Sequence, residues 1–148
     1  YIDLVMIART GIHVFESKNL SGCIFGDEAS RHWTHTLKRG PKQQFYNPIW
    51  QNESRISSLK RQLALEADAF KSYVVFSDQC TLKKMYVQSG HVKVMNRNLI
   101  VREIIKDMAE LPDIFTPLEI NQIYSELVPY THTAAAIGHA RIETVRLE

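Results

Sequence analysis

The sequence has little of what marks a disulfide-stabilised, zinc-binding or membrane-spanning protein. Its 148 residues include two cysteines, Cys23 and Cys80, and no Cys-x-x-Cys spacing, which argues against a disulfide framework and against a thiolate zinc site. No apolar run is long enough to span a bilayer, and no signal peptide is recognisable. We therefore expect reduced thiols, a cytoplasmic location and no membrane partner.

Net charge is also small, because 18 Lys and Arg residues face 16 Asp and Glu residues, for a formal charge of +2. This balance permits a nucleic-acid partner but does not indicate one. Hydrophobic residues make up 45% of the chain and charged residues 23%, as in ordinary globular domains. A chain of this length can bury one core, and it shows no internal repeat.

The order of predicted elements indicates a mixed α/β domain, with a central sheet flanked by helices. Residues 2–8 form a short apolar run, and residues 12–18 alternate between apolar and polar, so the two predict a β-hairpin. We expect further strands near residues 23–25, 33, 73–77, 85–88 and 92–95, the last two forming a pair around Ser89-Gly90, and helices over 48–71, 98–110 and 117–128.

Capping signals support the helix assignments. Asn47-Pro48 is a typical helix start, with Asn as the N-cap and Pro at the first helical position. Asn98 can cap the second helix, and Pro112 ends it. Thr116 and Glu119 have the spacing of a capping box.

The predicted hairpin brings three charged residues together. If Thr10 and Gly11 form its loop, Asp3 faces Lys18 and Val5 faces Glu16, so Asp3, Glu16 and Lys18 share one side of the sheet. Two carboxylates about 7 Å apart at the backbone repel each other unless a hard divalent cation lies between them. A neighbouring ammonium can stabilise charge on a phosphate. An ordinary Glu–Lys pair at a sheet edge is the alternative.

This pattern, an Asp, a turn and then Glu16-Ser17-Lys18, resembles the signature of the PD-(D/E)XK nuclease superfamily. The surrounding sequence is more specific. Residues 10–14 before the Glu, residues 18–22 after it, Gly26, Trp33 and the helix start at residues 47–51 together resemble the nuclease-related domain, or NERD. The resemblance extends to a helix ending near Phe70, about half of the chain.

The resemblance implies a restriction-endonuclease-like fold and Mg²⁺-dependent hydrolysis of phosphodiester bonds in DNA, with Mn²⁺ as an alternative ion. It assigns Asp3 and Glu16 as metal ligands together with the backbone carbonyl of Ser17, and Lys18 as the catalytic lysine. It also indicates Gln51 as an accessory polar residue, since Gln51 lies at the edge of the apolar stripe of its helix. Gln44 is a weaker candidate for that role.

One departure from the family concerns the segment before Asp3, where members usually carry a helix and a strand. We therefore expect residues 1–130 to form a nuclease-related domain that lacks its N-terminal elements, and residues 131–148 to form a tail that can be helical. Two other interpretations stay open. One is a nucleic-acid-binding or regulatory module that has lost turnover, and the other is an interaction domain that docks through the helices after Asn98.

Other residue groupings give weaker signals. His32 and His35 lack a third metal ligand nearby, and Cys80 lacks a histidine base. Gly22 and Gly26 do not form a phosphate loop, and the stretch around His132 and His139 is typical of a surface helix. A small basic cluster next to aromatic residues suits nucleic-acid contact, although a solvated loop explains it as well. It comprises Lys38, Arg39 and Lys42, followed by Phe45, Tyr46 and Trp50.

Overall fold

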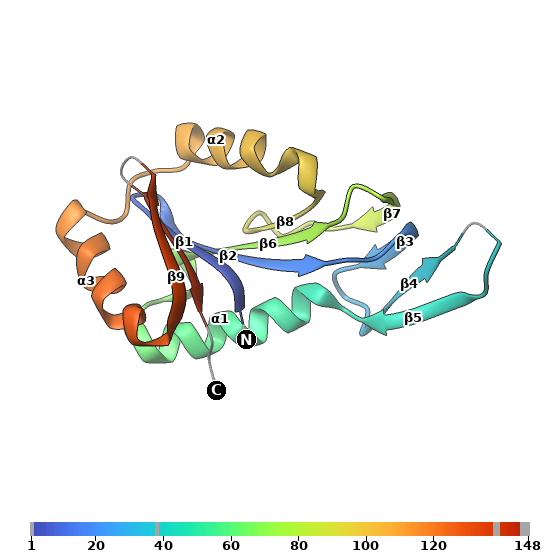
Figure 1. The fold of residues 1–148 in the computed structure, drawn as a ribbon, viewed down its shortest axis with the longest axis horizontal. Helices are drawn as coiled ribbons and strands as arrows, with labels where there is room; N and C mark the ends of the chain where they lie inside the picture. The colour runs from blue at the N-terminus through green and yellow to red at the C-terminus, as the bar shows by residue number, and fades with distance from the viewer. Residues whose placement is uncertain (1, 38, 138–139, 146–148) are drawn as a thin grey trace.

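The computed structural model describes the backbone of residues 2–37, 39–137 and 140–145, and the side chains of residues 4–37 and 39–130. These residues form a mixed α/β structure with two sheets, and helices cover both faces of the larger one (Figure 1). The expected α/β class is confirmed. The central sheet flanked by helices is the six-stranded one, and a second sheet of four strands, which the sequence did not predict, accompanies it.

The larger sheet has the spatial order β8 (Val92–Asn96), β6 (Phe70–Phe76), β2 (Gly11–Lys18), β1 (Ile2–Ala8), β10 (Ala140–Val145) and β9 (Thr131–Ile137). The smaller sheet has the order β5 (Lys42–Tyr46), β4 (His32–Thr36), β3 (Gly22–Asp27) and β7 (Cys80–Tyr86). The helices are α1 (Pro48–Leu63), α2 (Ile100–Glu110) and α3 (Pro117–Leu127), with 3₁₀ turns η1 (Ala67–Ala69), η2 (Arg97–Leu99) and η3 (Val128–Tyr130).

Strand β2 lies inside the larger sheet, antiparallel to β1 and parallel to β6. Its alternation sends Val14 and Glu16 to one face and His13 and Phe15 to the other. The first face packs against α1 and α3, and the second packs against α2 (Figure 1). The helix α1 therefore lies on the same side of the sheet as Glu16.

The start of α1 is fixed by Asn47, as the sequence predicts. Its side-chain oxygen accepts hydrogen bonds from the backbone N–H groups of Ile49 (2.9 Å) and Trp50. Its buried amide group also donates to the carbonyl of Ser30 (2.8 Å), which ties the helix to the turn between β3 and β4. The helix ends earlier than predicted, because Ala64 adopts a left-handed conformation and Phe70 belongs to β6.

The later elements agree only in part with the expectations. Thr116 and Glu119 form the predicted capping box of α3. Asn98 does not cap α2, because it lies within η2 and its backbone N–H donates to Asp78. The predicted pairing across Ser89-Gly90 is wrong, because β7 pairs with β3 in the smaller sheet whereas β8 pairs with β6 in the larger one.

The expectation of a helical tail over residues 131–148 is also wrong. The structure places strands β9 and β10 there, and β10 pairs antiparallel with β1. This pairing supplies backbone hydrogen-bond partners to a β1 edge that would otherwise be open. His132 lies in β9, and His139 lies outside the described residues. None of the helices in the described part of the chain is both long and apolar enough to cross a membrane.

Candidate active site

The β1–β2 register differs from the predicted one by two residues. Val5 lies opposite Val14 and Ala8 opposite Gly11, so the loop consists of Arg9 and Thr10. Gly11 has a φ of +139°, and a Cβ there would lie 2.8 Å from a backbone oxygen, so the chain needs glycine at this position. A shift of two residues keeps every side chain on its predicted face.

The shift changes which residue faces Glu16. Continuing the observed register by one residue beyond Leu4–Phe15 puts Asp3 opposite Glu16, rather than opposite Lys18. The side chain of Asp3 lies outside the described residues.

Glu16 is the centre of a polar cluster between β2 and α1. The side chain is 4% exposed, and the residues that precede it on the same face of β2, Ile12 and Val14, are apolar and buried. Lys18 lies with its Nζ 3.4 Å from Oε1 of Glu16, and the guanidinium of Arg55 forms an ion pair with Oε2. Burial of a carboxylate is costly without such partners. The described cluster carries one negative and two positive charges.

Gln51 lies where the sequence predicts, on the face of α1 that meets the hairpin. Its Oε1 accepts a hydrogen bond of 2.9 Å from Nζ of Lys18. The lysine ammonium is therefore held from two sides, by Gln51 on the helix and by Glu16 on its own strand. Gln44 does not join this cluster, because it is exposed on β5 opposite Thr34.

Arg55 and Asn52 are parts of the site that the sequence reasoning missed. Arg55 follows Gln51 by four residues, a spacing that places both on one helix face. Asn52 interrupts the apolar stripe of α1 and is fully buried. Its amide nitrogen donates to the carbonyl of Val14 (3.0 Å) and to Oγ of Ser72 (2.8 Å), which fixes α1 against β2 and β6.

The oxygen atoms around Glu16 determine whether the site suits a divalent ion. Oε2 of Glu16 is buried and has no hydrogen bond among the described residues, although Arg55 pairs with it. Ser17 carries a backbone carbonyl between Glu16 and Lys18, and Asp3, the other ligand expected from the sequence, has its side chain outside the described residues. Oxygen donors of this kind suit Mg²⁺. Within the described side chains, His, Cys, Asp and Glu form no cluster of three.

The other candidate groupings are not supported as sites. His32 is exposed and His35 is buried, since residues three apart on β4 point to opposite faces. Cys80 is buried, and its thiol donates to the carbonyl of Leu20 (2.9 Å). Burial raises the pKa of the Cys80 thiol, which disfavours the reactive thiolate.

A second buried polar network lies on the opposite face of the sheet, under α2. His13 joins Oγ1 of Thr10 and the hydroxyl of Tyr73, each at 2.9 Å, and Tyr73 donates in turn to Asp107. The network ends at Lys93, whose Nζ donates a hydrogen bond of 2.6 Å to Asp107. Desolvation lowers the pKa of His13 to about 4, and desolvation with the Asp107 hydrogen bond raises that of Tyr73. This network holds α2 to the sheet.

The amino-acid sequence matches a known protein family. The family model described as nuclease-related domain (NERD) matches residues 1–77, slightly more than half of the chain. The chain belongs to the NERD family. The matched segment contains the whole cluster of Glu16, Lys18, Gln51 and Arg55, so the family expected from the sequence is confirmed.

The comparison also finds one curated relative of this NERD protein, an uncharacterised protein of Bacillus anthracis. The two are 30% identical over 128 residues, which cover 86% of this chain and 58% of the relative. The chain thus spans less than two thirds of that relative's length. No solved structure matches the chain.

Proposed function

We propose that this NERD protein is a Mg²⁺-dependent nuclease that hydrolyses phosphodiester bonds in DNA. The observation that carries the proposal is the arrangement of Glu16 and Lys18 with Gln51. A nearly buried carboxylate and a half-buried ammonium share one strand face, and a helix amide holds the ammonium in place. The position of this cluster within the family match supports a functional origin rather than an ordinary surface ion pair.

The side chains of Asp3 and Glu16 and the carbonyl of Ser17 would hold the ion, with Mn²⁺ as an alternative. When bound, Mg²⁺ supplies Lewis-acid polarisation of a phosphoryl oxygen and lowers the pKa of a bound water. Glu16 lies inside the fold, which keeps its carboxylate fixed and away from competing water.

Lys18 would stabilise the charge that develops on the phosphate and hold the attacking water. Its Nζ is oriented by Gln51 and Glu16, so the ammonium does not need to be ordered when substrate binds. Arg55 balances Glu16 from the helix side. The positive excess of the described cluster suits an anionic phosphodiester.

A cleavage assay on plasmid DNA with Mg²⁺ or Mn²⁺ tests the proposal. Glu16→Gln keeps the shape of the side chain but removes its charge, and Lys18→Met keeps the length of the side chain but removes the ammonium. We expect each change to lower the cleavage rate by about 10²-fold or more. Glu66→Gln and Lys106→Met are matched controls, because both residues are exposed and lie outside the cluster.

Loss of activity on chelation with EDTA, restored by Mg²⁺, should accompany the effects of the two site variants. Cleavage that continues at the wild-type rate in both Glu16→Gln and Lys18→Met would contradict the assignment. Circular dichroism of each variant distinguishes loss of the site from loss of the fold.

A second candidate is a DNA-binding module of the same fold that no longer turns over. The observation that favours it is that both carboxylate oxygens of Glu16 already face cations, Lys18 and Arg55. DNA binding without metal-dependent cleavage would support this alternative. For either function we propose a reducing, cytoplasmic location, in agreement with the free thiols of Cys23 and Cys80.

A further inference from the structure

The β4–β5 hairpin extends away from the larger sheet, beyond the start of α1 (Figure 1). We propose that this hairpin with its flanking arginine, residues 31–46, is an arm that holds the phosphate backbone of duplex DNA beside the candidate active site. The inference rests on the proposed nuclease function and names the surface that binds its substrate. The charge of the arm, its buried inner face, its polar outer face and its position all support this role.

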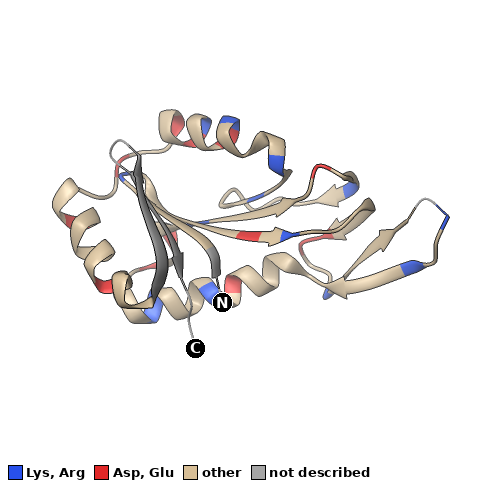
Figure 2. Cartoon of the chain, in the orientation of Figure 1, with Lys and Arg blue, Asp and Glu red and all other residues tan. Residues whose placement is uncertain are grey.

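Charge along this segment has a single sign. No Asp or Glu occurs from residue 29 to residue 52, whereas Arg31, Lys38, Arg39 and Lys42 fall within it. The side chains of Arg31, Arg39 and Lys42 are exposed. Figure 2 shows basic segments at the far end of the hairpin and no acidic segment on its strands. In a chain of nearly balanced charge, such a projection favours contact with a polyanion.

The inner face of the arm is anchored in the core. Trp33 is 1% exposed and stacks on Phe76 of β6, with ring centroids 6.2 Å apart, and Phe45 meets it edge-on at 6.1 Å. The indole N–H of Trp33 donates to the carbonyl of Asp27 (3.0 Å). The base of the arm is therefore rigid, so binding DNA does not require it to be ordered first.

The outer face of the arm is polar and accessible. Alternation along the two strands brings hydroxyl, imidazole, amide, phenol and ammonium groups to this side, and all of them can donate hydrogen bonds to phosphate oxygens. The cross-strand pairs on this face are His32 with Tyr46, Thr34 with Gln44, and Thr36 with Lys42. The strand β5 is also the edge of its sheet, so no described strand covers its outer side.

The dimensions of the arm suit a duplex. A five-residue strand is about 17 Å long, and the major groove of DNA, about 12 Å wide, admits a two-stranded β-ribbon. Arg39 lies in the loop at the tip and Lys42 begins β5, so both charges are at the end that would reach the backbone. Contacts of this kind position the protein without reading sequence.

The base of the arm continues into the candidate active site. Tyr46, the last residue of β5, packs edge-on against Trp50 in the first turn of α1, with ring centroids 6.1 Å apart. Trp50 is followed by Gln51, whose side chain binds Lys18. DNA held along the arm would therefore lie next to the cluster that we propose cleaves it.

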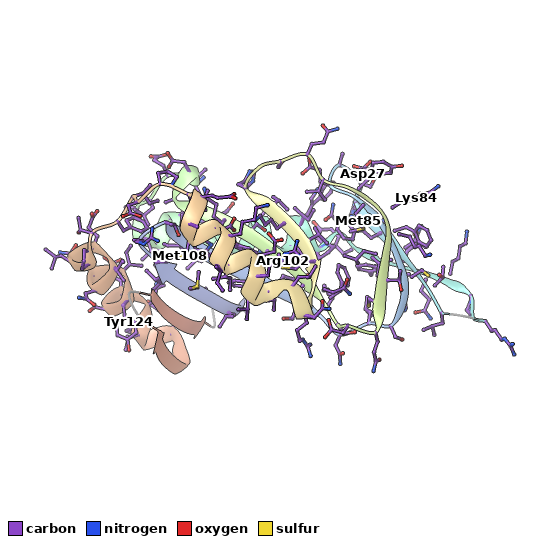
Figure 3. The ribbon with its side chains drawn as sticks, turned by 90° about the horizontal axis from the view of Figure 1, so that it is seen from above. Asp27, Lys84, Met85, Arg102, Met108 and Tyr124 are labelled. Carbon is purple, nitrogen blue, oxygen red and sulfur yellow. The ribbon has the colours of Figure 1, made fainter. Side chains whose placement is uncertain are left out.

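Fluorescence anisotropy with a short labelled DNA duplex tests the arm, in EDTA so that no cleavage occurs. The test variant is Arg39→Ala/Lys42→Ala. The control is Arg102→Ala/Lys106→Ala, which removes the same charge from exposed positions on α2; Figure 3 labels Arg102 on that helix. We expect the arm variant to bind about tenfold more weakly, with a salt dependence reduced by about 1.8 in log–log slope, and the control to bind within about twofold of wild type.

The outcomes separate the arm from the nuclease proposal. Arm-dependent binding without Glu16-dependent cleavage supports the arm and contradicts the nuclease. Unchanged affinity in the arm variant, or no binding by the wild type, overturns the arm even if cleavage persists. Tighter arm-dependent binding to single-stranded DNA or to an RNA duplex of the same sequence overturns the assignment to duplex DNA. Matched thermal melts verify that the exposed substitutions leave the fold intact.

Discussion

The ion pair between Glu16 and Arg55 joins two side chains that are 4% and 20% exposed, the lowest combined exposure of any ion pair among the described residues. Taking two charges from water is expensive, so removal of one partner costs more than the pair contributes. This asymmetry makes the pair testable through stability, independently of any activity.

Arg55→Met should lower the free energy of unfolding by about 1–3 kcal/mol, because among the described side chains it leaves the buried Glu16 with Lys18 as its ion-pair partner. The double variant Glu16→Gln/Arg55→Met should recover much of this loss. Urea denaturation of both variants measures the difference. Arg61→Met, exposed on the same helix, should change stability by less than about 0.5 kcal/mol. Equal losses in the single and double variants would contradict a coupled pair.

His13 gives the protein a specific pH dependence. Its pKa is lowered to about 4, first by desolvation, while Lys71 and Lys93 add to the lowering and Asp107 opposes it. The unfolded chain therefore takes up a proton below about pH 6.5, whereas the folded chain does so only below about pH 4. Stability should fall as pH decreases through this window and level off below it for this group.

Urea denaturation between pH 4 and pH 7 measures this contribution, which should reach about 3 kcal/mol. His13→Gln keeps a polar group facing Thr10 or Tyr73 but cannot take up the proton, so its stability should depend less steeply on pH. His32→Gln, at an exposed position on β4, is the control. Parallel pH profiles for wild type and His13→Gln would show that His13 is not the responsible group.

For individual residues, the sequence predicts on which face of a strand or helix each site residue lies better than it predicts which side chains contact one another. Strand parity places Glu16 and Lys18 together, and the edge of the apolar stripe places Gln51 toward them. Arg55 was missed because a cation on an amphipathic helix normally faces solvent. The register was off by two residues, because Thr10-Gly11 and Arg9-Thr10 are both acceptable loops in sequence.

At the scale of elements, the second sheet depends on close packing between β3 and β4. A Cβ added to Gly26 would lie 2.4 Å from the ring of Trp33, which is itself fixed by Phe76 and by its hydrogen bond to Asp27. The ring has no room to move aside, so this glycine is required for the sheet to form.

Gly26→Ala should therefore lower the melting temperature markedly, with a loss of about 1–3 kcal/mol from overpacking. Gly90→Ala is the matched control, because a Cβ there would have no neighbour within 4 Å. Differential scanning calorimetry compares the two. Melting temperatures that fall equally in both variants would mean that contact with Trp33 is not the cause.

Helices with strong local capping signals were predictable from the sequence, whereas strands whose pairing joins distant parts of the sequence were missed. The caps at Asn47 and Thr116 fix the starts of α1 and α3 from sequence alone. β5 was missed because Lys42, Gln43 and Gln44 carry no apolar alternation. Its strand character comes from pairing with β4. Similarly, no signal in the sequence shows that β7 leaves β8 to join β3.

At the scale of the whole molecule, the candidate site lies where the two sheets and α1 come together. The parallel pair β2 and β6 carries the site, and the crossover between them contains both the arm and α1 (Figure 1). The same connection therefore supplies Gln51, Arg55 and the proposed DNA-binding surface. The far side of β1 is occupied by β10, a pairing between the two ends of the described chain that sequence patterns could not predict.

The central claim is that Glu16 belongs to a divalent-metal site in a nuclease. Crystals of the protein grown with Mn²⁺ test it most directly, because anomalous scattering identifies the ion without relying on activity. The account predicts an anomalous peak bound by Glu16 and Asp3, with Lys18 still held by Gln51, and no such peak in Glu16→Gln. A structure at saturating Mn²⁺ in which Glu16 binds only Lys18 and Arg55, with no ion beside it, would contradict the account.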